Sequence, residues 1–187
     1  MEIENCIILC GGKSSRMGKK KETLDFFGQS LADFQANKMQ KIFKKVYFSS
    51  KTAIQNSYKI PTILDSSAEF AAIFGLESSL KTLSQSLFVV SIDSPFLTQQ
   101  SIAKLQESYQ KTKKSTFAKN KKIHPLLGIY AYDSLIPIQK QISQKNYRLM
   151  ELLGIIETNF IEIEESQTQN LNTPYDYLQA TQGFLNG

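Results

Sequence analysis

Apolar and polar positions follow two rhythms along this chain, and the two rhythms alternate. Short apolar runs are typical of strands, and apolar residues three or four positions apart are typical of amphipathic helices. The runs predict strands over residues 3–10, 46–50, 59–64, 87–92, 115–118, 126–132 and 160–163. The helical spacing predicts helices over residues 30–43, 73–83 and 98–109, with further helices starting near residues 133 and 174. This alternation predicts an α/β fold: one domain over residues 1–187, a three-layer α/β/α sandwich around a mostly parallel sheet.

Polar residues at the predicted helix starts give these boundaries a physical basis. Ser30 and Thr98 are N-cap residues, whose side chains can accept a hydrogen bond from the first helical turn. Pro174 suits the first turn of the last helix, because the N–H that proline lacks would have no partner there. Ligands of parallel α/β sheets bind beyond the carboxyl ends of the strands, so functional residues are expected in the loops that follow them.

Composition narrows the class of protein. Of the 187 residues, 41% are hydrophobic and 21% are charged. These fractions are ordinary for a globular protein in water. No apolar run is long enough for a membrane helix, and the opening MEIEN is unlike a signal peptide. Two cysteines four positions apart on one predicted strand indicate no disulfide framework, and a single histidine leaves no zinc pattern. We therefore expect a cytoplasmic monomer with no membrane partner.

The net charge of +5 hides an asymmetry between the two ends of the chain. Residues 151–187 contain six acidic residues and neither lysine nor arginine, so all 22 basic residues lie in the first 150. A basic body indicates an anionic partner: a nucleotide, a phosphate ester or a nucleic acid. The simpler interpretation, for most of these lysines, is a solvated surface.

The stretch LCGGKSSRMGKKK, residues 9–21, follows the first predicted strand. Its glycines allow backbone N–H groups to turn toward an anion, and its arginine and lysines add positive charge, so it should bind phosphates. It is not a Walker A loop, because five residues separate Gly12 from Gly18 and Lys20 stands where Ser or Thr belongs. It also lacks the G-x-G-x-x-G spacing of a dinucleotide-binding loop.

This stretch resembles the signature loop of the Rossmann-like nucleotidyltransferase fold, and the chain as a whole resembles the molybdenum cofactor guanylyltransferases, the MobA family. Three further segments carry the resemblance in the family's order: DSPFL at 93–97, HPL at 124–126 and NLNTP at 170–174. The family transfers GMP from GTP to the terminal phosphate of molybdopterin and releases pyrophosphate. The resemblance therefore implies a nucleotidyltransferase whose substrates are GTP and the molybdopterin cofactor.

The residues on the nucleotide side can be assigned roles. Backbone donors from the glycines and positive charge from Arg16 and Lys21 would neutralise the triphosphate and the leaving pyrophosphate, as a highly anionic transition state requires. By resemblance, backbone atoms of Leu9 and Cys10 face the guanine, and Asp65 is a second nucleotide-contacting carboxylate, although a helix cap or turn would also explain an Asp there. The predicted GTP-binding residues are Leu9, Cys10, Gly11, Gly12, Lys21, Asp65 and Asp93.

Asp93 is the candidate metal ligand and, with Arg16 and Lys21, a candidate catalytic residue. It follows the strongest predicted buried strand, where a carboxylate is costly unless it is paired or binds a cation. A Mg²⁺ ion that bridges Asp93 to phosphate oxygens would meet that demand. A turn-forming or helix-capping Asp ahead of Pro95 is the alternative.

Three polar residues late in the chain are assigned to the molybdopterin side: His124, Asn170 and Asn172. His124 would bind the pterin rather than transfer a proton, and a structural hydrogen bond is its simpler role. The two asparagines are either loop formers or polar clamps on the pterin or its phosphate. A lysine-rich segment is a solvated turn or, alternatively, a transient docking surface for a cofactor-delivery or molybdoenzyme chaperone protein; it comprises Lys111, Lys113, Lys114, Lys119, Lys121 and Lys122.

Three departures from the family pattern bear on specificity. Lys20 replaces the usual Asp of the first loop, Ser49 replaces an Asn after the second strand, and AAIFG at 71–75 keeps only the last glycine of the family's segment. GTP is therefore implied by resemblance alone. Another cytidylyl- or uridylyltransferase of a sugar or alditol phosphate, a catalytically inactive nucleotide sensor and a nucleic-acid-binding protein are the alternatives. Against the last, the basic residues do not interleave with an aromatic platform, so no nucleic-acid partner is expected.

Overall fold

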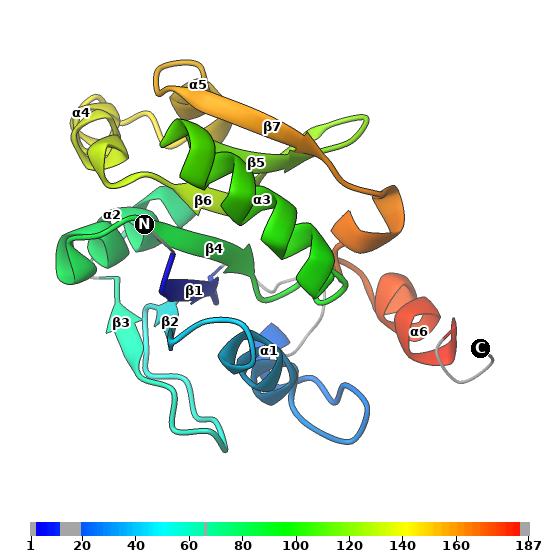
Figure 1. The fold of residues 1–187 in the computed structure, drawn as a ribbon. Coiled ribbons are helices and arrows are strands. Elements are labelled where there is room, and N and C mark those ends of the chain that lie inside the picture. The colour runs from blue at the N-terminus through cyan, green and yellow to red at the C-terminus, as the bar shows by residue number, and fades with distance from the viewer. Residues whose placement is uncertain (1–2, 12–19, 66, 184–187) are drawn as a thin grey trace.

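Seven strands form one sheet in the computed structural model, which describes residues 3–11, 20–65 and 67–183 (Figure 1). The sheet has the order β3-β2-β1-β4-β6-β5-β7. The strands are β1 (Asn5–Leu9), β2 (Lys45–Ser50), β3 (Thr62–Leu64), β4 (Leu87–Ser91), β5 (Ser115–Lys119), β6 (Ile123–Tyr130) and β7 (Thr158–Glu162). β3, β2, β1 and β4 pair in parallel, as do β5 and β7. The mostly parallel sheet expected from the sequence is thus confirmed.

One strand runs against the others. β6 is antiparallel both to β4 and to β5, and it lies between them. Only residues 120–122 separate β5 from β6. A parallel crossover needs about a dozen residues or more. The short turn therefore imposes an antiparallel hairpin, which brings the beginning of β6 to the carboxyl end of β4.

Helices cover both faces of the sheet, so the three-layer arrangement is confirmed (Figure 1). One core layer packs α1 (Leu31–Gln40) and α3 (Gln99–Thr112) against the sheet; the opposite layer contains α2 (Ala72–Leu83), α4 (Leu135–Ser143) and α5 (Leu149–Leu153). The last helix, α6 (Pro174–Gly183), adds Tyr177 and Ala180 to the first layer. None of the helices in the described ranges is long and apolar enough to cross a membrane.

The predicted caps are present, whereas the structure moves several of the predicted boundaries. The Ser30 side chain accepts a hydrogen bond from Asp33 N, and that of Thr98 accepts one from Ser101 N. Asp133 does not start a helix: it lies in a short 3-10 turn, Tyr132–Ser134, and α4 follows that turn. β6 begins at Ile123 rather than at residue 126, because pairing with β5 extends it to the turn. The five-residue helix α5 is too short to show a helical period in the sequence.

The charge asymmetry of the chain is partly neutralised within the fold. β7 lies beside β5, and three acidic residues of the C-terminal segment thereby meet lysines of the β5–β6 region. The ion pairs are Lys114–Glu157 at 3.3 Å, Lys119–Glu162 at 3.7 Å and Lys121–Glu165 at 2.8 Å. All six side chains are exposed, so each pair adds little stability. Much of the lysine-rich segment therefore faces acidic side chains of the same chain.

Candidate active site

The carboxyl ends of four parallel strands surround a cavity of about 440 Å³, which we call the nucleotide cavity. Backbone hydrogen bonds continue past the strand ends: Cys10 N donates to Ser49 O at 2.8 Å, Ile92 N to Leu9 O at 3.0 Å and Asp65 N to Ser50 O at 2.9 Å. These bonds continue the hydrogen-bonding pattern of the sheet into the first residues of the loops. The cavity lining combines these loops with the start of α2 and comprises residues 9–11, 20–22, 49–52, 65, 70–72, 75, 91, 92 and 126.

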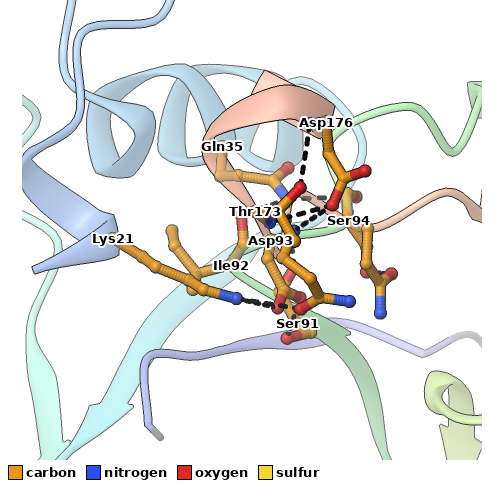
Figure 2. A network of polar contacts seen from close by, with 10 residues as sticks. Lys21, Gln35, Ser91, Ile92, Asp93, Ser94, Thr173 and Asp176 are labelled. Atoms are coloured by element: carbon orange, nitrogen blue, oxygen red, sulfur yellow. Dashed lines mark hydrogen bonds and ion pairs between the residues drawn. The ribbon is translucent and has the colours of Figure 1, made fainter. Parts of the chain in front are cut away.

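An ion pair between Lys21 and Asp93 lies beside this cavity (Figure 2). Lys21 Nζ is 2.6 Å from Asp93 Oδ2, and the two side chains are only 19% and 14% exposed. Ser91 Oγ donates to the other carboxylate oxygen, Oδ1, at 2.6 Å. Lys21 also donates to Asn172 Oδ1 at 3.1 Å. Lys21 ends the stretch 9–21, which we call the glycine-lysine loop. Its ammonium group thus contacts both the loop that follows β4 and the C-terminal loop, residues 170–173.

The loop that carries Asp93 is held from two sides. Gln35 of α1, which is fully buried, donates through Nε2 to Ser91 O and Ser94 O at 3.2 Å each. From the other side, Leu171 N donates to Asp93 O at 2.8 Å, and Ser94 Oγ donates to Asn170 Oδ1 at 2.7 Å. Gln35 was missed in the sequence, although a glutamine on the apolar face of a predicted helix was the available signal.

The C-terminal loop is itself fixed by the beginning of α6 (Figure 2). Asp176 Oδ2 accepts from Asn172 N at 3.1 Å and from Thr173 N at 2.9 Å, and Thr173 Oγ1 accepts from Asp176 N at 3.1 Å. This reciprocal pattern resembles a capping box, and Pro174 occupies the first helical position as expected. The cap places the Asn172 side chain against Lys21.

Asp65 also forms an ion pair, with a lysine that sequence reasoning missed. Lys51 Nζ lies 2.9 Å from Asp65 Oδ2, and Asp65 Oδ1 accepts from Ser67 N at 2.9 Å. Lys51 also donates to Ser67 O and lies over the Phe70 and Phe74 rings, at 5.3 Å and 5.8 Å from their centroids. The Asp65 side chain is 8% exposed and that of Lys51 is 25% exposed. Asp65 is therefore a paired carboxylate in the cavity wall, besides forming the turn that was its alternative role.

A second and larger cleft, of about 1640 Å³, lies beyond the Lys21–Asp93 pair and is called the acceptor cleft below. Its walls come from α1, the loop at 95–98, the β5–β6 turn, the segment 165–172 and α6. Asn170 and Asn172 line it, whereas Lys21 lines the nucleotide cavity. The contact between Lys21 and Asn172 therefore joins the two compartments.

His124 lies on β6 and reaches the acceptor cleft only through a neighbour. Its Nε2 is 3.1 Å from Oδ1 of Asn120, which lines that cleft and donates to Thr168 Oγ1 at 2.6 Å. Burial, with a smaller contribution from the Lys122 charge, lowers the pKa of His124. The imidazole is therefore neutral at pH 7, and its observed contact is a structural hydrogen bond.

Gly75, the glycine that the 71–75 segment retains, lies in close packing against β1 and β2. A Cβ at this position would lie 2.8 Å from Ser49 Oγ and 3.0 Å from Leu9 Cδ2. α2 thus approaches the ends of β1 and β2 closely enough to form a wall of the nucleotide cavity. Ser49, which is buried, donates to Gly75 O at 3.5 Å, so the small residue at position 49 belongs to the same contact.

Comparison with known proteins agrees with this geometry. Residues 6–158 match the family described as the MobA-like NTP transferase domain. The chain belongs to this family. It is 37% identical, over 183 residues, to the molybdenum cofactor guanylyltransferase of Campylobacter jejuni subsp. doylei, covering 92% of this chain and 93% of the relative. It is 30% identical to the probable molybdenum cofactor guanylyltransferase of Aquifex aeolicus, covering 94% of this chain and 89% of the relative.

Solved structures show the same fold for this MobA-like chain. The crystal structure of molybdopterin-guanine dinucleotide biosynthesis protein A from Archaeoglobus fulgidus superimposes with a TM-score of 0.85, covering 98% of this chain and all of that chain, at 20% identity. A putative protein of Aquifex aeolicus superimposes with a TM-score of 0.77 at 30% identity, covering 91% of this chain and 94% of that chain. The protein is therefore a nucleotidyltransferase enzyme with a nucleotidyltransferase fold.

The structure brings most of the predicted residues of this MobA-like enzyme to the two compartments. Leu9, Cys10, Gly11, Lys21 and Asp65 line the nucleotide cavity. Asp93 pairs with Lys21 at its edge, and Asn170 and Asn172 line the acceptor cleft. Gly12 and Arg16 lie outside the described residues.

Asp93 fits the role of a single protein ligand to Mg²⁺. No group of three or more His, Cys, Asp or Glu side chains gathers within the described ranges, so a site made entirely of protein ligands is not found there. Mg²⁺ at phosphate-transfer sites needs only one or two carboxylates, with phosphate oxygens and water completing its shell. The Asp93 carboxylate has two oxygens with about four lone-pair positions, of which Lys21 and Ser91 use two.

Proposed function

We propose that this nucleotidyltransferase transfers GMP from GTP to the terminal phosphate of molybdopterin, forming the guanine dinucleotide cofactor and pyrophosphate. The observation that carries the proposal is the junction of Lys21, Asp93 and Asn172 between the two compartments. A transfer between two bound molecules needs such a shared boundary, because the reacting atoms must meet while each substrate keeps its own pocket. The names of the relatives support the choice of these two substrates.

In this reaction an oxygen of the acceptor phosphate attacks the α-phosphorus of GTP. The new bond joins that oxygen to the α-phosphorus, and the bond to the β-phosphate oxygen breaks, so pyrophosphate leaves with the electron pair. The enzyme needs no nucleophile of its own. Burial raises the pKa of the Cys10 thiol well above its usual range, so this cysteine in the cavity wall stays protonated and unreactive.

The protein's contribution is positioning and charge neutralisation. Lys21 brings a positive charge to the edge of the nucleotide cavity, where the phosphates and the leaving pyrophosphate are proposed to gather. Arg16, from the same loop, is proposed to add a second charge. Backbone atoms of Leu9, Cys10 and Gly11 line the cavity and are proposed to contact the guanine nucleotide, together with Gly12.

Asp93 is proposed to hold Mg²⁺, which would act as a Lewis acid on the phosphate oxygens when bound. In the structure, the Asp93 carboxylate is balanced by Lys21. Both groups are mostly buried, so their pairing offsets the desolvation that either charge alone would suffer. Nucleotide binding would replace this pair with contacts to phosphate.

On the acceptor side, Asn170 and Asn172 are proposed to position molybdopterin and its phosphate, and His124 to support the cleft wall through Asn120. The cofactor would fill part of the acceptor cleft, whose volume of about 1640 Å³ leaves room for a metal-bearing pterin. We expect the protein to work as a cytoplasmic monomer and to receive the cofactor from a delivery protein.

The direct test mixes the purified protein, molybdopterin cofactor, Mg²⁺ and one nucleoside triphosphate. Formation of the guanine dinucleotide with stoichiometric pyrophosphate from GTP, and not from CTP, UTP or ATP, is the expected result. Thermal shifts with the four nucleotides provide an independent comparison of binding. Preferential turnover of CTP or UTP with a sugar or alditol phosphate would instead assign the protein to another branch of the fold.

A further inference from the structure

The geometry points to Lys51, paired with Asp65, as the residue that selects guanine in the nucleotide cavity. This inference rests on the proposed function and deepens it, because it names side chains that would choose between the bases. The two side chains form an ion pair at 2.9 Å and both line the cavity.

Lys51 and Asp65 lie at a different end of the nucleotide cavity from Lys21. Lys21 and Ser91 belong to the end where β4 and the glycine-lysine loop meet, next to Asp93. Lys51 and Asp65 follow β2 and β3, two and three strands away from β4 in the sheet. If the triphosphate occupies the Lys21 end, the base must extend toward the Lys51 end.

The pair retains free hydrogen-bonding capacity on both partners. An ammonium group has three donors, and within the described part of the chain Lys51 uses two of them, on Asp65 Oδ2 and Ser67 O. A carboxylate has about four acceptor positions, and Asp65 uses two, for Lys51 and Ser67 N. One donor therefore lies directly beside two acceptor positions in a cavity wall.

That arrangement complements the edge of guanine and opposes that of adenine. Guanine presents the O6 acceptor beside the N1–H and N2–H₂ donors, so Lys51 can donate to O6 while Asp65 accepts from N1–H and N2–H₂. Adenine presents an N6–H₂ donor toward the lysine and the N1 acceptor toward the carboxylate, so the remaining donor of Lys51 and the remaining acceptor positions of Asp65 find no partner on this base. Uracil matches only in part, because its O2 acceptor would face the carboxylate.

The surroundings hold the pair in place. The Ser67 backbone N–H fixes the Asp65 carboxylate, and the Phe70 ring, whose centroid lies 5.3 Å from Lys51 Nζ, is close enough for a cation–π interaction. The Asp65 side chain is only 8% exposed. A mismatched base would therefore leave the remaining hydrogen-bonding positions of a poorly hydrated ion pair unfilled. Sites of this kind reject the wrong partner more strongly than apolar pockets do.

The test combines protein variants with modified nucleotides in the full-length protein. The variants are Lys51→Met, Lys51→Arg and, as a matched control, Lys81→Met, which removes an exposed lysine of α2 that pairs with Glu77. Dissociation constants are measured by calorimetry for GTP, ATP, 2′-deoxy-GTP and 2-aminopurine riboside triphosphate, a guanine analogue that lacks O6 and the N1–H donor. Circular dichroism confirms that each variant is folded.

Wild type and Lys81→Met should bind GTP at least about 10- to 100-fold more tightly than the 2-aminopurine nucleotide, because one charged hydrogen bond contributes that range and the analogue lacks both O6 and N1–H. Lys51→Met should lose the part of this difference that comes from O6 and much of the preference for GTP over ATP, and Lys51→Arg should keep part of both. If Lys51→Met does not fold, the wild-type comparison of GTP with the 2-aminopurine nucleotide still decides, because equal binding of the two overturns the inference.

Three other outcomes would overturn the inference, each for a different reason. A Lys51→Met variant that keeps the full preference for GTP over ATP, in an enzyme that forms the guanine dinucleotide, overturns the role of Lys51 and leaves the proposed function intact. A defect of Lys51→Met that disappears with 2′-deoxy-GTP places the pair at the ribose and overturns base selection. A wild-type enzyme that uses another nucleotide in preference to GTP overturns the proposed function and the inference together.

Discussion

The two compartments of the site are built in different ways. The nucleotide cavity, of about 440 Å³, is formed by the ends of parallel strands, whose continued backbone hydrogen bonds fix its wall. The acceptor cleft, of about 1640 Å³, depends on loops and on α6, which are fixed by side-chain contacts such as Ser94 with Asn170 and Thr173 with Asp176.

The match to the MobA-like NTP transferase domain ends at residue 158, before the C-terminal loop and α6. All residues that line the nucleotide cavity lie within the matched range, whereas segment 165–172 and α6 of the acceptor cleft lie beyond it. Four sets of variants test this division. They lie at Asp93 in the junction, at Lys21 on the nucleotide side, at Asn172 on the acceptor side and at Lys38 in the wall of the acceptor cleft.

The largest effect is expected at the junction, where both compartments depend on Asp93. Asp93→Asn removes the charge that balances Lys21 and the proposed Mg²⁺ ligand. Turnover should therefore fall at least about 100-fold, the scale of losing a preorganised charged group. Pyrophosphate release at saturating GTP measures the loss. Asp133→Asn, in an exposed 3-10 turn, is the matched control and should keep wild-type turnover. Turnover within a few-fold of wild type in Asp93→Asn would refute the metal role.

On the nucleotide side, Lys21 and Lys20 are predicted to differ. Lys21→Ala should weaken GTP binding roughly 10- to 100-fold, because a charged hydrogen bond to phosphate contributes about 1.5–3 kcal/mol. Lys20→Ala should change it only a few-fold, because Lys20 is exposed and forms no part of the Asp93 pair. Titration calorimetry with GTP compares the two variants. A larger loss in Lys20→Ala would show that the loop has been assigned the wrong register.

On the acceptor side, Asn172→Ala should separate the two substrates. GTP affinity should stay within a few-fold of wild type, while product formation from molybdopterin falls roughly 10- to 100-fold, the cost of one hydrogen bond to a charged group. The modest effect on GTP comes from the lost contact of Asn172 with Lys21 at 3.1 Å.

Asn159→Ala on β7, where the side chain bonds Thr112 instead, is the control for Asn172→Ala. Loss of GTP binding in a folded Asn172→Ala protein would mean that the two compartments are not separable.

The smallest effect concerns Lys38, whose Nζ in the wall of the acceptor cleft donates to Pro95 O at 2.6 Å. Burial lowers the pKa of Lys38 from 10.5 to about 8. Between these values the unfolded chain binds more protons than the folded one, so this group makes stability rise with pH from about 8 to 10.5. Lys38→Met should lack that rise, measured as the difference in unfolding free energy between the two proteins across this range.

Lys41→Met, which removes an exposed lysine just after α1, should follow the wild-type profile of stability against pH. A wild-type profile in Lys38→Met would show that Lys38 remains hydrated and charged within the fold.

The sequence by itself determined most of the elements, and it predicted phosphate binding by the first loop. A buried strand such as 87–92 and a capped helix start such as Ser30 depend on neighbouring residues only. Each can therefore be recognised from a few consecutive positions of the sequence. The glycine-lysine loop, the segment after β4 and the C-terminal NLNTP motif likewise identified Lys21, Asp93 and Asn172 as members of a site.

Only the tertiary structure decided how these pieces meet. Lys21 lies 72 residues from Asp93 and 151 from Asn172, so no local pattern could place one ammonium group on both. Strand order and helix packing bring separate segments together. They produce the ion pair of Lys51 with Asp65 and the hydrogen bonds from Gln35 to the loop that carries Asp93. Periodicity records which face of an element is buried, whereas the partner of a buried polar group is set by the fold as a whole.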